Sequence, residues 1–157
     1  TENASRHVAG IPGWMEVAKA LETAQIPLPL IYGHNDLLPA NFLYANNRVW
    51  LIDFEYSAYS TAMFDLAGLS SNAGFDRHQS LELLILYFSS NPDAGLIQAL
   101  EAMQCASLLR EAMWSMVSEL FLKAPGVDYA AYTANQLDAY SARLDDYQSR
   151  YGKIAKS

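Results

Sequence analysis

The sequence predicts a mainly α-helical domain (an α+β fold) that carries one small β-hairpin. Two β-prone runs, residues 42–44 and 49–52, flank Asn46 and Asn47, and asparagine tolerates the positive φ that a tight hairpin turn requires. Most of the chain after Asp53 has helical apolar spacing and helix-start signals. With 157 residues, 52% of them hydrophobic and 17% charged, the chain fits one folded domain with a sizeable core.

The first helix is predicted from Trp14 to about Gln25. Apolar residues recur there at helical spacing, and Pro27 and Pro29 follow and end the run. Residues 30–32 form a short apolar run that predicts a buried strand. This strand leads into a polar loop over residues 33–41.

Three further helices are predicted from their start signals. Asp76 and Gln79 have the spacing of a capping box, and Asn91 with Pro92 predicts the start of a helical stretch that continues to about Lys123, as one helix or two. Asp128 is predicted to cap the last helix. One face of that helix carries an apolar stripe: Leu137, Tyr140, Leu144, Tyr147 and Tyr151.

Composition narrows the classes of partner. A net charge of -7 argues against nucleic acid, which needs a clustered basic face. No apolar stretch approaches the roughly 18 residues that span a bilayer, so membrane insertion is not expected. Cys105 is the only cysteine, which excludes an intrachain disulfide, and its apolar helical surroundings predict a buried thiol. The first residues lack the layout of a signal peptide, so we expect a cytoplasmic location.

Two polar runs carry the candidate chemistry. In the first, residues 34–41 (HNDLLPAN), Asp36 and Asn41 lie five residues apart on one irregular loop. In the second, residues 51–56 (LIDFEY), Asp53 follows the predicted hairpin. Phosphoryl transfer from ATP needs a carboxylate that orients and deprotonates the acceptor hydroxyl, and oxygen ligands for Mg²⁺. Asp36 as base, with Asn41 and Asp53 as ligands, supplies that set.

The two runs resemble the protein-kinase signature but differ from it at two positions. That signature is HRDLxxxN followed by DFG. Here Asn35 replaces the arginine and Glu55 replaces the glycine. The arginine would pair with a phosphorylated activation loop, and the sequence has no such loop between Asp53 and Asp65.

The coupled runs resemble the choline/ethanolamine kinase family, within the aminoglycoside phosphotransferase-like and protein-kinase-like group. The resemblance is strong over residues 31–68 and implies that residues 1–157 form the C-terminal catalytic lobe of a small-molecule kinase. It also implies that Asp36 is the base and that Asn41 and Asp53 are magnesium ligands, with Glu55 near the second metal.

The resemblance assigns supporting roles to further residues. It implies that His34 orients the catalytic loop and that Asp65 braces this loop by accepting backbone hydrogen bonds, although Asp65 could also be only a helix cap. It implies that Tyr56 and Trp114 contribute to an aromatic site for a cationic acceptor, since aromatic faces attract such ions. Glu111, on the same predicted helix as Trp114, could add negative potential or pair with Arg110.

The expected activity is therefore an ATP- and Mg²⁺-dependent kinase acting on the hydroxyl of a small amino alcohol, choline or ethanolamine. Thiamine, an aminoglycoside or a sugar are alternative acceptors, and a non-catalytic helical binding module is the alternative from another class. The sequence contains neither the glycine-rich loop nor the phosphate-binding lysine of such kinases. We expect the chain to be a fragment whose partner is a missing N-terminal lobe of the same polypeptide. Without that lobe, we expect the fragment not to turn over ATP.

Overall fold

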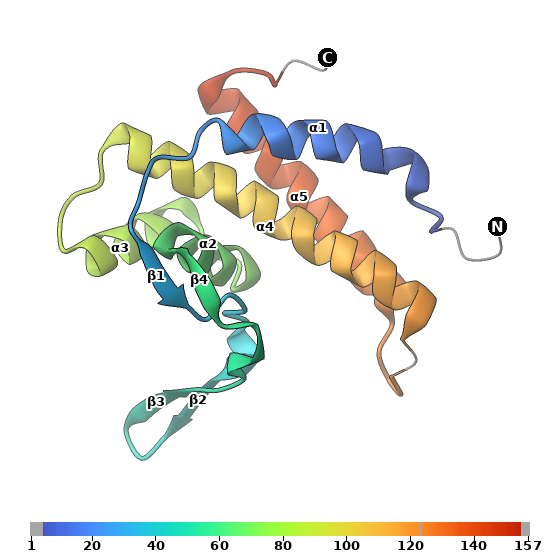
Figure 1. The fold of residues 1–157 in the computed structure, drawn as a ribbon, viewed down its shortest axis with the longest axis horizontal. Helices are drawn as coiled ribbons and strands as arrows, with labels where there is room; N and C mark the ends of the chain where they lie inside the picture. The colour runs from blue at the N-terminus through green and yellow to red at the C-terminus, as the bar shows by residue number, and fades with distance from the viewer. Residues whose placement is uncertain (1–4, 123, 155–157) are drawn as a thin grey trace. The chain divides into compact units, whose positions relative to one another are not determined.

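A computed structural model describes residues 5–122 and 124–154 and shows five α-helices and four short strands within them (Figure 1). The helices are α1 (Ile11–Glu22), α2 (Ala62–Asn72), α3 (Arg77–Phe88), α4 (Ala94–Phe121) and α5 (Tyr129–Tyr151). The strands are β1 (Leu30–Gly33), β2 (Phe42–Ala45), β3 (Arg48–Leu51) and β4 (Ala58–Thr61). The predicted mainly α fold with a small β component is confirmed.

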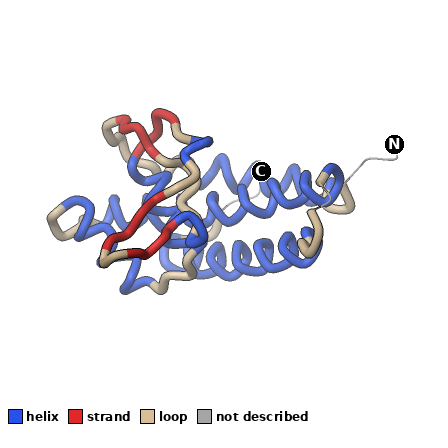
Figure 2. The backbone as a smooth tube through the Cα atoms, turned by 90° about the horizontal axis from the view of Figure 1, so that it is seen from below, coloured by secondary structure: helices blue, strands red, loops and turns tan. Residues whose placement is uncertain are grey.

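The strands form two separate two-stranded antiparallel sheets (Figure 2). The predicted hairpin is present, with Phe42 opposite Leu51 and Ala45 opposite Arg48. Its turn residues, Asn46 and Asn47, have φ of 53° and 58°, which fits the left-handed conformation expected of a two-residue hairpin turn.

The second sheet was not predicted, because residues 58–61 were expected to be helical. Strand β4 pairs with β1, with Leu30 opposite Thr61 and Gly33 opposite Ala58. The prediction that residues 30–32 are buried was also wrong: Leu30 and Tyr32 are each 67% exposed. Only one face of this two-stranded sheet lies against helices, and Ile31 on that face packs on the core.

Close contacts divide the chain into two compact units. The motif unit comprises residues 24–104. The helical unit comprises, of the described chain, residues 5–23, 105–122 and 124–154. Helix α4 contributes to both units. The assignment of the chain to a single catalytic lobe stays a prediction.

The core of the motif unit is built from α2, α3, the first turns of α4 and the inner face of β1. Alanine, leucine and methionine side chains fill it. Its buried members are Ala62, Met63, Leu66, Ala67, Leu84, Ala99 and Leu100. This packing places α2, and with it Asp65, directly behind the end of β1.

The predicted helix starts were right in two cases and wrong in two. Asp76 and Gln79 form the predicted capping box, and the side chain of Asp128 accepts a hydrogen bond from the backbone N–H of Ala131. The first helix spans Ile11–Glu22 rather than 14–25, because Pro12 is accommodated in its first turn.

Helix α4 begins at Ala94 and not at Asn91–Pro92. Its capping side chain is Asp93, which accepts a 2.8 Å hydrogen bond from the backbone N–H of Leu96. The helix is one continuous element to Phe121. Lys123, where the sequence predicted the end of this stretch, lies outside the described residues.

In the helical unit, the predicted stripe of α5 forms its least exposed face, with Tyr140 and Tyr147 buried. Cys105 is fully buried, as predicted. Hydroxyl hydrogen bonds link α4 to α5: Thr133 donates to Ser115 at 2.8 Å, and Ser115 donates to the carbonyl of Tyr129 at 2.9 Å. Within the described residues, no helix is long and apolar enough to cross a membrane.

Candidate active site

The loop that carries Asp36 is held in shape by its own backbone and by Asn41. The carbonyl of Asp36 accepts a hydrogen bond from the backbone N–H of Leu38 at 2.8 Å and another from Asn41 Nδ2 at 2.9 Å. Asn41 Nδ2 also lies 3.5 Å from Asp36 Oδ2. The two residues that sequence analysis paired, five positions apart, are therefore in direct contact.

Asn41 also connects this loop to the second motif. Its carbonyl accepts a 3.1 Å hydrogen bond from the backbone N–H of Ile52, the residue before Asp53. Asp53 has φ of 66°, a left-handed conformation that Asp adopts more readily than most residues, and it precedes a single 3₁₀ turn, Phe54–Tyr56. Asp53 and Glu55 are exposed. The two motifs thus meet at the end of β3.

His34 is buried beneath the same junction. Its Nε2 donates to the carbonyl of Ile52 at 2.9 Å, and its ring packs against Phe54 with ring centroids 4.6 Å apart. This bond places the proton on Nε2, while Nδ1 has no hydrogen-bond partner within the described part of the chain. These contacts are those of a residue that packs beneath the loop and orients it; the role itself stays a proposal.

Asp65 lies in the first turn of α2 and points its carboxylate at the start of the loop. Oδ2 accepts from the backbone N–H of His34 and Oδ1 from that of Asn35, both at 2.7 Å. The N-cap residue of α2 is Thr61, not Asp65. Asp65 is therefore bonded to the loop and is not merely a helix cap.

The donor set suits a hard cation such as Mg²⁺. The hydrogen bonds of the Asn41 side chain use its amide nitrogen, and this leaves the amide oxygen, the atom that Mg²⁺ prefers, for a ligand. Asp53 and Glu55 add exposed carboxylates two residues apart. Among the described residues, no group of three or more His, Cys, Asp or Glu side chains could hold a metal ion alone. Mg²⁺ is usually bound by one or two carboxylates together with substrate phosphates.

The predicted acceptor residues belong to different units. Tyr56 is 57% exposed in the motif unit. Trp114, in the helical unit, is 49% exposed and meets the ring of Tyr129 edge-on at 6.1 Å, so it is not a buried core residue. Glu111 is buried and bonded to Arg110 at 2.7 Å, which is one of the two alternatives considered for it. An aromatic site built from Tyr56 and Trp114 stays a proposal.

Asn35 and Ser60 are site residues that sequence reasoning missed. Asn35 Nδ2 donates to the carbonyls of Tyr56 at 3.0 Å and Ala58 at 3.3 Å, and its Oδ1 accepts from Ser60 Oγ at 2.7 Å. The replacement of the kinase-signature arginine by Asn35 was the available signal. Ser60 gave none, since its partner lies 25 residues away.

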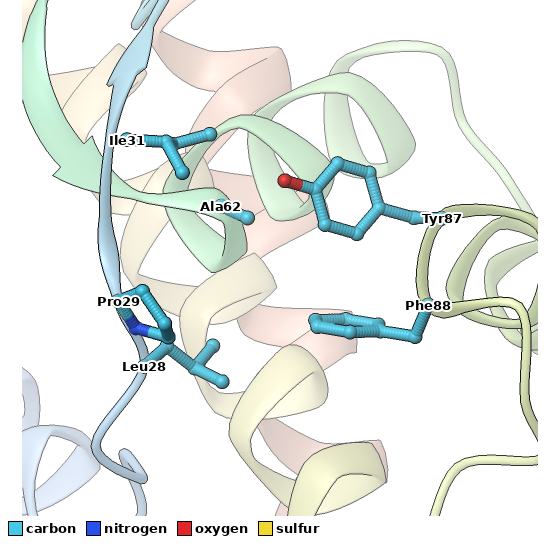
Figure 3. Close-up of a pocket in the computed structure, with 6 residues that line it drawn as sticks. All are labelled: Leu28, Pro29, Ile31, Ala62, Tyr87 and Phe88. Atoms are coloured by element: carbon cyan, nitrogen blue, oxygen red, sulfur yellow. The ribbon is translucent and has the colours of Figure 1, made fainter.

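A small apolar pocket of about 140 Å³ lies elsewhere in the motif unit (Figure 3). The rings of Tyr87 and Phe88 extend from the end of α3 toward the segment before β1 and the start of α2. The residues that line the pocket are Leu28, Pro29, Ile31, Ala62, Tyr87 and Phe88. None of these residues belongs to the predicted site.

The fold of this chain is similar to that of solved structures. A solved structure of a choline/ethanolamine kinase family protein from Mesorhizobium loti matches 90% of this chain with a TM-score of 0.75 and 24% identity. The structure of an ethanolamine kinase from Plasmodium vivax matches 87% of the chain with a TM-score of 0.69 and 18% identity. The chain covers 48% and 39% of these two proteins. It has the fold of the C-terminal lobe of a kinase-like protein.

Sequence comparison then shows which family the chain resembles. Residues 14–84 match the family model of choline/ethanolamine kinase. A probable ethanolamine kinase from Arabidopsis thaliana is 37% identical over 62 residues, which are 38% of this chain and 17% of that protein. Probable ethanolamine kinase A from Dictyostelium discoideum is 27% identical over 154 residues, 85% of this chain and 44% of that protein. These matches confirm the predicted resemblance to the choline/ethanolamine kinase family. The chain spans less than half the length of these relatives.

Proposed function

We propose that this chain provides the catalytic loop of an ATP- and Mg²⁺-dependent kinase that phosphorylates the hydroxyl of a small amino alcohol, choline or ethanolamine. The observation that carries the proposal is the contact between Asp36 and Asn41 at the junction with Asp53. Phosphoryl transfer depends on positioning a base and metal ligands together, and at this junction hydrogen bonds join the loop of Asp36 and Asn41 to the segment that carries Asp53.

Asp36 is the proposed base. Its backbone is fixed by the hydrogen bonds from Leu38 and Asn41, so the carboxylate has a defined place to meet an acceptor. There it orients the acceptor hydroxyl and takes its proton as the oxygen attacks. Asn41 and Asp53, with Glu55 nearby, are the proposed ligands of Mg²⁺. Magnesium bound with ATP neutralises charge on the transferring phosphoryl group.

The acceptor class is argued from the aromatic residues and from the relatives. Tyr56 presents an exposed ring three residues from Asp53, and Trp114 presents an exposed ring in the helical unit. Aromatic faces attract the ammonium group of an amino alcohol. Relatives of this chain bear the names of choline and ethanolamine kinases. Thiamine, an aminoglycoside and a sugar are the acceptors to be compared.

The rest of the ATP site is proposed to lie in an N-terminal lobe of the same polypeptide. Relatives are more than twice as long as the segment they share with this chain. The proposal therefore concerns the complete protein, with this chain as its catalytic C-terminal part.

The test is to express the complete reading frame that encodes this chain and to follow ADP release with Mg²⁺ and ATP. Choline, ethanolamine, thiamine, an aminoglycoside and a sugar are offered in turn. Asp36→Ala should lower turnover about 10²- to 10⁴-fold, as expected for removal of a positioned base. Asp138→Ala, on an exposed position of α5, is the matched control and should leave turnover unchanged.

Turnover that requires choline or ethanolamine and collapses in Asp36→Ala supports the reaction and the acceptor. Turnover with another acceptor would support the kinase reaction and contradict the proposal that the acceptor is an amino alcohol. A folded complete protein that is inactive with every acceptor would favour the binding-module alternative.

A further inference from the structure

The catalytic loop has a second anchor besides Asp65, formed by the side chain of Asn35. Four hydrogen bonds converge on this residue: its backbone N–H donates to Asp65, its Nδ2 donates to two carbonyls, and its Oδ1 accepts from Ser60. The two carbonyls belong to Tyr56, the last residue of the second motif, and to Ala58, the first residue of β4. Asn35, which directly precedes Asp36, therefore ties the start of the catalytic loop to residues 56–60.

The backbone conformation at residue 35 favours asparagine over most other residues. Its φ is 64°, in the left-handed region that costs most side chains energy but that asparagine enters more readily. This turn of the backbone lets the Asn35 side chain reach back alongside β4, while the next residue, Asp36, continues into the loop. A serine or alanine at this position would pay the conformational cost without making the same bonds.

The absence of a side chain at Gly33 leaves room for the hydrogen bonds of Asn35. A Cβ atom at this position would lie 2.6 Å from Ser60 Oγ, 2.9 Å from Asp65 Oδ2 and 3.0 Å from Asn35 Oδ1. Ser60 Oγ and Asn35 Oδ1 are bonded to each other in the anchor, and Asp65 Oδ2 accepts from the backbone N–H of His34. These three atoms occupy the space beside the Gly33 backbone, so the anchor requires glycine there.

We propose that Asn35 is a positioning residue that fixes Asp36 relative to Tyr56, and so sets how the acceptor hydroxyl meets the base. This role rests on the proposed function. His34 joins the loop to Ile52, on the side of the metal ligands, whereas Asn35 joins it to the Tyr56–Ser60 side. Loss of the Asn35 side chain should accordingly disturb the acceptor more than ATP and Mg²⁺.

The test uses Asn35→Gly in the complete protein, because glycine keeps the left-handed backbone and removes only the side-chain bonds. We expect kcat/KM for the acceptor to fall about 10- to 100-fold, with KM for ATP changed less than about twofold. Asn46→Gly is the matched control: the same substitution at another left-handed asparagine, in the exposed hairpin turn, which should change neither constant. Ser60→Ala should give a smaller loss in the same direction, and the two losses should not add.

Amide hydrogen exchange of residues 54–61 provides a readout that does not depend on turnover. Exchange there should accelerate about tenfold or more in Asn35→Gly and stay unchanged in Asn46→Gly. Equal losses for acceptor and ATP constants, or unchanged exchange, would overturn the inference and leave Asn35 a purely structural residue. If the unmodified protein turns over no acceptor, the proposed function and the positioning role both fail, while the exchange result still shows whether the anchor exists.

Discussion

At the scale of single residues, the candidate site was predictable where chemistry depends on residue type and not where it depends on long-range contact. Asp36, Asn41 and Asp53 follow from two motifs at a characteristic separation, and the structure brings them together. The anchor formed by Asn35 with Ser60 was not predictable, because the two residues meet only after β1 and β4 pair. Trp114 was assigned to the site from the family resemblance alone, since the apolar pattern of its helix is typical of a core, and its side chain is 49% exposed.

Tyr140 carries a pH prediction at this scale. Burial, and to a smaller extent the nearby Cys105, raises the pKa of Tyr140 from 10.0 to about 12. The unfolded chain releases this proton near its ordinary pKa, whereas the folded chain keeps it until the higher value. The contribution of Tyr140 to stability is therefore complete below the unfolded pKa and is lost as pH rises through the folded one.

The measurement is the free energy of unfolding of the protein and of Tyr140→Phe at about pH 9 and about pH 11.5. The unmodified protein should lose about 1.4 kcal/mol more than the variant for each pH unit between the two pKa values. Parallel losses in both proteins would contradict the assignment of this effect to Tyr140.

At the scale of helices and strands, the hairpin turn could be predicted from neighbouring residues, whereas the pairing of β4 with the distant β1 could not. The hairpin β2–β3 follows from Asn46 and Asn47, because turn chemistry is encoded within four residues. Strand β4 was missed because residues 58–61 extend only to meet β1, 28 or so residues earlier in the chain. The start of α4 was misplaced because three residues in a row, Asn91, Pro92 and Asp93, all suit a helix start.

The start of α4 can be tested by comparing two alanine substitutions. Asp93→Ala removes the carboxylate that accepts from the backbone N–H of Leu96 and should lower the free energy of unfolding by about 1 kcal/mol. Asn91→Ala, at an exposed position ahead of the helix, should change it by less than about 0.5 kcal/mol. Chemical denaturation of both variants gives the two values. A larger loss for Asn91→Ala would restore the helix start predicted from the sequence.

At the scale of the whole molecule, the class of fold could be predicted, whereas its division into units could not. Helical periodicity and a single hairpin indicated the mainly α fold. The sequence has no composition change at the boundary between the units, because α4 runs through it without interruption. The motif unit has a hydrophobic core of its own.

The contribution of this core to stability can be measured with substitutions on α3. Leu84 is fully buried, and Leu84→Ala should lower the free energy of unfolding by about 2–5 kcal/mol, since a cavity is left in a closely packed cluster. Leu86→Ala, two residues further along the same helix and 78% exposed, should change it by less than about 0.5 kcal/mol. Similar losses for the two variants in urea denaturation would show that α3 does not face the core in this way.

The burial of Cys105 has a practical consequence for spectroscopy. It is the only cysteine of the chain and none of its surface is exposed, so thiol reagents should react with it slowly. A cysteine introduced at an exposed site, such as Ser149 on α5, could then carry a fluorophore or spin label on the native background. Pairs of such labels, one in each unit, would let distances within this chain be followed without first replacing Cys105.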